Sequence, residues 1–246
     1  MDVSPAAPAQ CTPRLQNDGV PETAPTHRVA VESTPKRVFA TALDWPGWSR
    51  AGKSEDFALE ALLTSAPRYA RLVSGAGVAF ARDAPAEVVL RVPGSAYTDF
   101  GVPGAEFDFD LNPLPAAEVK RTLALLVAAW EALDAAVAAA PAELRKGPRG
   151  GGRDRDKVAA HVLEAEAAYA GPIGFKLVPP AIEDEVGIAT HRAAVLEALT
   201  AVASRPAPIP GAKPKRWTFR YATRRIAWHA LDHAWEIEDR SSPEPV

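Results

Sequence analysis

Apolar residues in the first half of the chain gather in short runs bounded by turn residues. Residues 29–32 and 37–43 are rich in β-branched and apolar side chains, and a polar Ser-Thr-Pro-Lys segment lies between them. Residues 87–92 and 107–111 have the same character. Runs of this length and composition are typical of β-strands, so four strands are expected before residue 112.

A helix is expected between the second and third of these strands. Ser54 is placed to cap it, and Glu55 and Asp56 follow in its first turn. Apolar residues then recur at helical spacing until Pro67, which should kink or end the helix because proline lacks a backbone N–H. Strands and helix together predict a small mixed α/β domain over residues 28–112.

From Ala116 the apolar period becomes helical. Successive apolar positions are separated by four, three, four, three and four residues, which is the stripe of a helix packed in a bundle; they are Val119, Leu123, Leu126, Trp130, Leu133 and Val137. Three more helices are expected, one from Asp154 or Asp156, one over 182–203 and one over 218–239. Residues 113–241 are therefore predicted to form a four-helix bundle, and the fold class to be α+β.

Composition narrows the functional classes. Residues 1–27 contain five prolines and few large apolar side chains, which predicts a disordered tail that includes Cys11 and His27. A single cysteine excludes an intrachain disulfide framework and a multi-thiolate metal site. The net charge of −3 gives no electrostatic reason to expect a nucleic acid or a membrane surface as a partner. No signal peptide is recognisable and no apolar run approaches the roughly twenty residues that span a bilayer, so a cytoplasmic location is expected.

The histidines are the strongest chemical signal. His229 and His233 lie four residues apart in the last predicted helix, so both imidazoles should share one face. His161 lies in the core-facing stripe of the second bundle helix. Two imidazoles from one helix and one from another can form a three-nitrogen site with open coordination positions, as in many catalytic zinc centres. His191 is a candidate fourth member.

Alternatives to a metal site stay open from these residues alone. A histidine on an apolar helix face is often a satisfied core or stacking residue. Glu236 and Glu164 are the candidate catalytic carboxylates, either orienting an imidazole or acting as a general base, with Glu166 as a further candidate. The same carboxylates could instead lie on exposed faces and pair with arginines. Imidazole accepts zinc, copper, iron and nickel; zinc or nickel is expected here.

Two helical segments carry a resemblance to a known family. RDKVAAHVLEAEAAYA and RRIAWHALDHAWEIEDR resemble the DinB superfamily of four-helix bundles, which includes thiol-dependent transferases and mycothiol-dependent maleylpyruvate isomerases. The resemblance covers about half of the chain. It implies that His161, His229 and His233 bind a divalent metal that activates a low-molecular-weight thiol or a water. It also implies a transferase or isomerase with a small-molecule substrate, and a homodimer is expected because such bundles often pair.

The first half is similar to a different family. LDWPGW followed by SEDFALEALL is similar to the HicB-like fold of antitoxins and free-standing modules, in which a proline-glycine turn leads from a strand into a helix. This similarity implies a binding or dimerisation module, with Trp45 and Trp48 either forming a recognition surface or capping the small core. It supports a second hypothesis, a non-catalytic protein-binding module in which the bundle is a scaffold.

Overall fold

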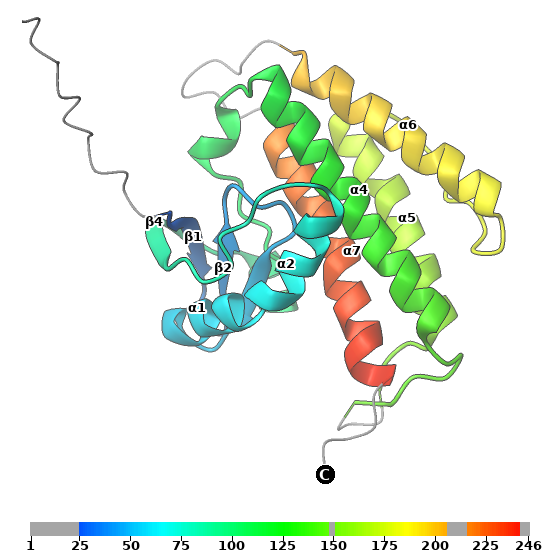
Figure 1. The fold of residues 1–246 in the computed structure, drawn as a ribbon, viewed down its shortest axis with the longest axis horizontal. Helices are drawn as coiled ribbons and strands as arrows, with labels where there is room; N and C mark the ends of the chain where they lie inside the picture. The colour runs from blue at the N-terminus through cyan, green and yellow to red at the C-terminus, as the bar shows by residue number, and fades with distance from the viewer. Residues whose placement is uncertain (1–24, 148–150, 206–215, 242–246) are drawn as a thin grey trace, which may run out of the picture.

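A four-stranded sheet with its own helices forms the first half of the molecule (Figure 1). The structure is a computed structural model that describes residues 25–147, 151–205 and 216–241. The elements of this half are β1 (His27–Ser33), β2 (Val38–Ala42), β3 (Ser49–Gly52), α1 (Glu55–Thr64), α2 (Ala66–Gly75), β4 (Ala86–Pro93), α3 (Ala96–Phe100) and the 3₁₀ helix η1 (Asp108–Leu111). The strand order is β3-β2-β1-β4, and β1 pairs antiparallel with β2 and parallel with β4. The predicted α+β class is confirmed.

The predicted capped helix is present and is divided where proline was expected to interrupt it. Ser54 is the N-cap of α1, and its hydroxyl accepts a hydrogen bond from the Phe57 backbone N–H at 3.4 Å. α1 ends at Thr64, and α2 starts at Ala66 with Pro67 in its first turn, where a missing N–H costs nothing. β3 was not predicted, because its four residues have neither alternation nor bulky apolar side chains.

The Pro46–Gly47 turn joins the sheet to the last helix. Gly47 has a φ of 88°, which favours glycine, and a Cβ there would lie 3.1 Å from backbone atoms of Ala227 in the last helix. Next to it, Trp48 is fully buried and donates its indole N–H to the Leu62 carbonyl at 3.1 Å and to the Ser65 hydroxyl at 2.9 Å. Trp48 therefore caps the core, as one of the two sequence interpretations held.

Two predictions about this half are wrong. His27 was assigned to the tail, but it begins β1, is 3% exposed and stacks on Phe80 with ring centroids 5.0 Å apart. Residues 1–24, including Cys11, lie outside the described residues. The strand expected at 107–111 is instead the 3₁₀ helix η1. The Asp110 carboxylate accepts the Phe107 backbone N–H at 2.8 Å and closes a tight turn. The alternation of Phe and Asp in this segment had indicated a strand.

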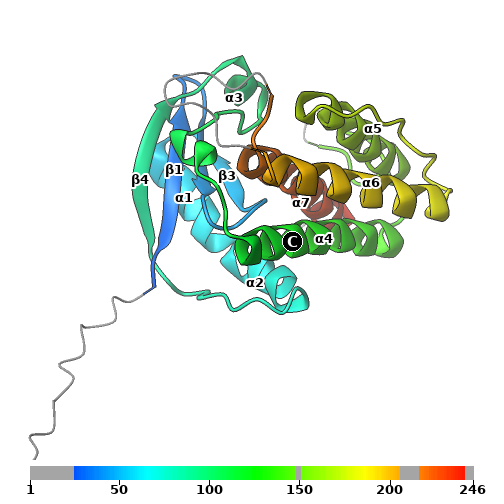
Figure 2. The same cartoon turned by 90° about the horizontal axis from the view of Figure 1, so that it is seen from above.

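Four long helices make up the second half. They are α4 (Ala116–Ala139), α5 (Arg155–Ile173), α6 (Glu185–Ala203) and α7 (Phe219–Ser241), and all four were predicted. α7 packs on each of the other three, and α5 also packs on α6. The two views show α5 and α6 on the side of the molecule away from the sheet, with α7 nearer to it (Figure 2). In α6 the helical period predicts Val186, Leu199 and Val202 to face inward: Leu199 and Val202 are buried, but Val186 is 78% exposed.

One hydrophobic cluster runs from the sheet to the last helix. It contains Val29 and Val31 of β1, Leu62 of α1, and Ile226 and Leu231 of α7. α7 is buried along most of its length because the sheet side and the other long helices both contact it. The core is thus continuous across residue 112, and the division into domains 28–112 and 113–241 stays a prediction.

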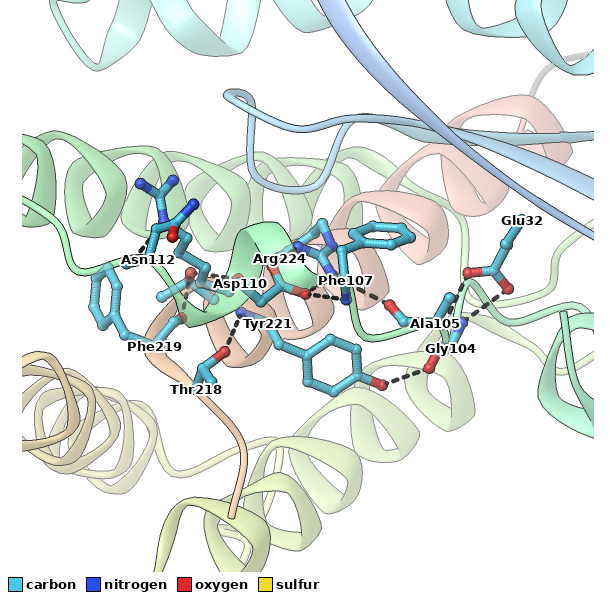
Figure 3. A network of polar contacts seen from close by, with 12 residues as sticks. Glu32, Gly104, Ala105, Phe107, Asp110, Asn112, Thr218, Phe219, Tyr221 and Arg224 are labelled. Atoms are coloured by element: carbon cyan, nitrogen blue, oxygen red, sulfur yellow. Dashed lines mark hydrogen bonds and ion pairs between the residues drawn. The ribbon is translucent and has the colours of Figure 1, made fainter. Parts of the chain in front are cut away.

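A buried polar network also joins the two halves (Figure 3). Arg224 of α7 forms an ion pair with Asp110 of η1, with Nη2 2.8 Å from Oδ2. In the same loop, the backbone N–H groups of Gly104 and Ala105 donate to the carboxylate of Glu32 in β1 at 3.1 and 2.8 Å. Removing one partner of a buried ion pair costs about 3–5 kcal/mol, so this network fixes α7 against the sheet.

Two of the long helices are more apolar than the sequence analysis expected. Of the described helices, α4 and α6 are long and apolar enough to cross a membrane by length and composition alone, which corrects the statement that no apolar run approaches that length. Core helices of globular proteins satisfy the same criterion, and α4 has 44% of its apolar window buried inside the molecule. The cytoplasmic location and the absence of a membrane partner stay predictions.

Candidate metal centre

Three histidines from two helices meet at the contact between α5 and α7. The ring centroid of His161 lies 5.0 Å from that of His229 and 5.2 Å from that of His233, and the two α7 rings are 4.6 Å apart. One ring nitrogen from each can be chosen so that all three lie within 4.8 Å of one another. The predicted convergence of these residues is confirmed, and the group could hold a metal ion.

Helix geometry explains the convergence. His229 and His233 are four residues apart, so they lie one turn apart on one face of α7. α5 packs directly on α7, which places His161 opposite the pair.

The surroundings favour the neutral form of two of the imidazoles, those of His161 and His229. Burial lowers the pKa of His229 well below its usual value, and the nearby His233, His161 and Arg225 lower that pKa further. Burial also lowers the pKa of His161, and Arg153 adds to the effect. A histidine must be unprotonated to bind a metal, so the environment holds these two side chains in the ligating form at neutral pH.

The hydrogen bonds also suit a metal. Nδ1 of His229 is buried and has no hydrogen-bond partner. Nδ1 of His233 lies 2.8 Å from Oε2 of Glu236, whose other oxygen accepts a hydrogen bond from Arg240 at 2.6 Å. A carboxylate on one imidazole nitrogen fixes the tautomer and leaves the other nitrogen with its lone pair available. The hydrogen bond from His233 lowers the pKa of Glu236, which keeps it charged.

Other predicted members are placed differently. Glu164 is exposed and influences His161 only through its charge, which raises the pKa of that imidazole. His191, expected as a fourth member, is not part of the group: its Nε2 lies 3.7 Å from Oε2 of the buried Glu166, between α5 and α6. The helical spacing of His191 had left its face undecided.

Two neighbours of the histidines were missed. The ring of Tyr169 contacts that of His229 at a centroid distance of 5.8 Å, and the guanidinium of Arg225 lies 5.3 Å from the centroid of the Tyr169 ring. Arg225 is four residues before His229, the same separation that joins His229 to His233. That spacing was a usable signal that would have placed Arg225 on the helix face of the two histidines.

The sequence was compared with known families and proteins, and no family model, curated protein or solved structure matches it. The resemblances to the DinB superfamily and to the HicB-like fold therefore stay predictions.

Proposed function

We propose that the protein is a divalent-metal-dependent enzyme in which α4 to α7 form a four-helix bundle of the DinB kind. The observation that carries this proposal is the convergence of His161, His229 and His233 within 4.8 Å. Three protein ligands leave coordination positions for a water or a substrate, whereas structural zinc sites use four protein ligands. The donor set therefore favours catalysis over a structural metal.

The chain's own residues supply orientation and neutral ligands. Bound zinc or nickel would supply the acidity that makes a coordinated thiol or water nucleophilic at neutral pH. Glu236 holds the proton of His233 on Nδ1, so that Nε2 stays free to bind. Glu236 is in this proposal a positioning residue, and Glu164, which is exposed and acts on His161 through its charge, is the candidate for exchanging protons with solvent.

We further propose that the nucleophile is an external low-molecular-weight thiol and the reaction a transfer or isomerisation of a small molecule. The three histidines provide no thiolate, so a thiol at the metal would be a co-substrate. The thiol proposal rests on the resemblance to the DinB superfamily. The metal proposal does not depend on it.

A second candidate is a protein-binding module. Phe57 on α1 and Phe100 on α3 are 60% and 86% exposed, and both belong to the half that resembles the HicB-like fold. Exposed aromatic side chains are common contacts at protein interfaces. In this alternative the histidines would be packing residues and the long helices a scaffold.

Metal content separates the two candidates. The purified full chain, incubated with zinc or nickel and then freed of excess ion, should hold about one ion per chain by mass spectrometry. The double variant His161→Ala/His229→Ala should hold none, and His191→Ala should hold as much as the wild type because His191 lies outside the group. A wild-type chain without metal after both incubations would contradict the enzyme proposal. A positive result would justify screening thiol-transfer reactions.

A further inference from the structure

Arg225 is a cation beside the histidine group whose charge is not balanced by the described residues. Its Nη1 is buried without an acceptor, its side chain interacts with the uncharged Tyr169 hydroxyl, and among the described residues no carboxylate forms an ion pair with it. Other arginines of the long helices differ: Arg224 pairs with Asp110, Arg240 with Glu236 and Arg192 with Asp134. A partly buried guanidinium without a counterion is costly, which makes this position a candidate for an anion.

Aromatic rings hold this cation next to the histidines. The guanidinium carbon of Arg225 lies 5.3 Å from the ring centroid of Tyr169 and 5.1 Å from that of Trp228. Tyr169 in turn contacts His229. Arg225 and His229 are four residues apart on α7, a rise of about 6 Å along the helix axis. The rings thus position the charge about one turn from the candidate ligands.

A second unpaired donor belongs to a ring that contacts Arg225. Nε1 of Trp228 is buried and has no acceptor, and the ring it belongs to is one of the two that contact Arg225. Arg153, at the start of α5, adds positive potential at His161 and His229. The carboxylate nearest to the histidines, that of Glu236, already accepts from His233 and Arg240. The described side chains therefore leave a surplus of donors and positive charge around His229.

We propose that Arg225 anchors the carboxylate of a small organic acid that carries a planar or aromatic body, next to the metal centre. This inference rests on the proposed function, because the acid would be the substrate of that site. A carboxylate is favoured over a phosphate because two buried donors lack an acceptor here, Nη1 of Arg225 and Nε1 of Trp228, which matches the two oxygens of a carboxylate in number. The neighbouring faces of Tyr169 and Trp228 suit a flat body.

Benzoate and its neutral analogue benzamide test the anchor. With the zinc-loaded full chain, calorimetry should show binding of benzoate and at least tenfold weaker binding of benzamide. Arg225→Met should weaken benzoate binding about 10- to 100-fold, the usual effect of losing a hydrogen bond to a charged group, with zinc content unchanged. Arg225→Lys should recover part of the affinity, since it restores the charge without the planar fork.

Arg220→Met is the matched control. Arg220 lies on the same helix and also contacts an aromatic ring, with its guanidinium 4.3 Å from the Phe109 centroid, but it donates to the Asn112 carbonyl and is remote from the histidines. Equal benzoate affinity in the Arg225→Met and Arg220→Met variants would overturn the proposal. So would equal binding of benzoate and benzamide by the wild type, which decides the matter even where a variant fails to fold.

Two further outcomes separate this inference from the metal proposal. Inorganic phosphate binding more tightly than benzoate in an Arg225-dependent manner would overturn the assignment to carboxylates. If no zinc is bound, the proposed function fails, and the same titrations are made on the metal-free chain. Arg225-dependent benzoate binding there would support the anion site alone, and its absence would overturn that site as well.

Discussion

Two clusters of titratable side chains lie on different faces of α5, and the free-energy cost of burying them is reduced in different ways. His161 faces α7 and meets two more histidines, a set of like groups that can all be neutral. Glu166, five residues later and about 140° around the helix, faces α6 and lies 3.7 Å from His191 and 3.9 Å from Arg192. The three rings themselves carry no opposite charge, and the one carboxylate hydrogen-bonded to them, Glu236, is shared with Arg240, whereas the second cluster combines an acid with two basic side chains.

The difference shows which cluster is suited to a ligand. In the Glu166 cluster, attraction between unlike groups reduces the cost of burying them without any added ion. In the histidine cluster nothing among the three rings attracts the others once they are neutral, and one ring nitrogen from each lies within 4.8 Å of the others, close enough to share one cation. Proximity of titratable groups is thus insufficient to identify a metal site; the sign and the number of charges decide.

The Glu166 cluster nevertheless has a cost of its own. Neither oxygen of Glu166, nor Nε2 of His191, nor Nε of Arg192 has a hydrogen-bond partner, and all four atoms are buried. Burial raises the pKa of Glu166 to about 7, against the attraction of Arg192. The folded state therefore binds this proton more tightly than the unfolded chain, and the free energy of unfolding falls as pH rises from about 4.5 through 7.

The largest expected effect comes from removing that titration. A shift from 4.5 to about 7 corresponds to about 3 kcal/mol. Glu166→Gln removes the ionisation, so its free energy of unfolding relative to the wild type should rise by about 3 kcal/mol between pH 4 and pH 8. Urea unfolding at a series of pH values measures this difference.

Glu164→Gln, two residues away and exposed, is the control: its charge acts on His161 and not on Glu166, so this variant should show no gain of about 3 kcal/mol between pH 4 and pH 8. Parallel stability curves for Glu166→Gln and the wild type would show that Glu166 has an ordinary pKa. The contrast between the two faces of α5 would then lose its electrostatic basis.

A smaller effect is expected at the hydrogen bond that orients His233. Glu236→Gln keeps an acceptor but loses the charge that fixes the tautomer, and loss of such a partner typically lowers metal affinity 10- to 100-fold, or about 1.4–2.7 kcal/mol. Competition with a chromogenic zinc chelator measures the affinity. In the control variant Glu164→Gln the affinity should stay within about threefold of the wild type, since that side chain touches none of the three rings.

Much of this site was predictable from local spacing. The separation of His229 from His233 fixes a common helix face, and the apolar neighbours of His161 orient it inward, so periodicity alone brought three residues together. The face of His191 could not be predicted, because α6 has alanine and valine on several sides and burial depends on where α5 packs. The helical period of α6 likewise predicted Val186 to be buried, but its side chain is exposed.

In the fold, the limits came from long-range contacts. The strand-like alternation of residues 107–111 gave way to η1 because Asp110 accepts the Phe107 N–H and pairs with Arg224, 114 residues away. His27 joined β1 because Trp45, Trp48 and Phe80 surround it. No local pattern contains these partners, so an interpretation from neighbouring residues alone was bound to miss them.

The smallest expected effect tests how the Glu166 cluster is balanced. Asp134 is 57% exposed at its side chain and pairs with Arg192 at 2.6 Å, and its charge raises the pKa of Glu166. Asp134→Asn should change the free energy of unfolding at pH 7 by less than about 1 kcal/mol, the range of exposed pairs. Because Arg192 would then act on Glu166 alone, the pKa of Glu166 should fall, and the pH at which stability declines should shift downward with it. The same urea series measures that shift. An upward shift would mean that Arg192 moves away from Glu166 when the Asp134 carboxylate is lost. The geometry of the cluster would then depend on the exposed ion pair between Asp134 and Arg192.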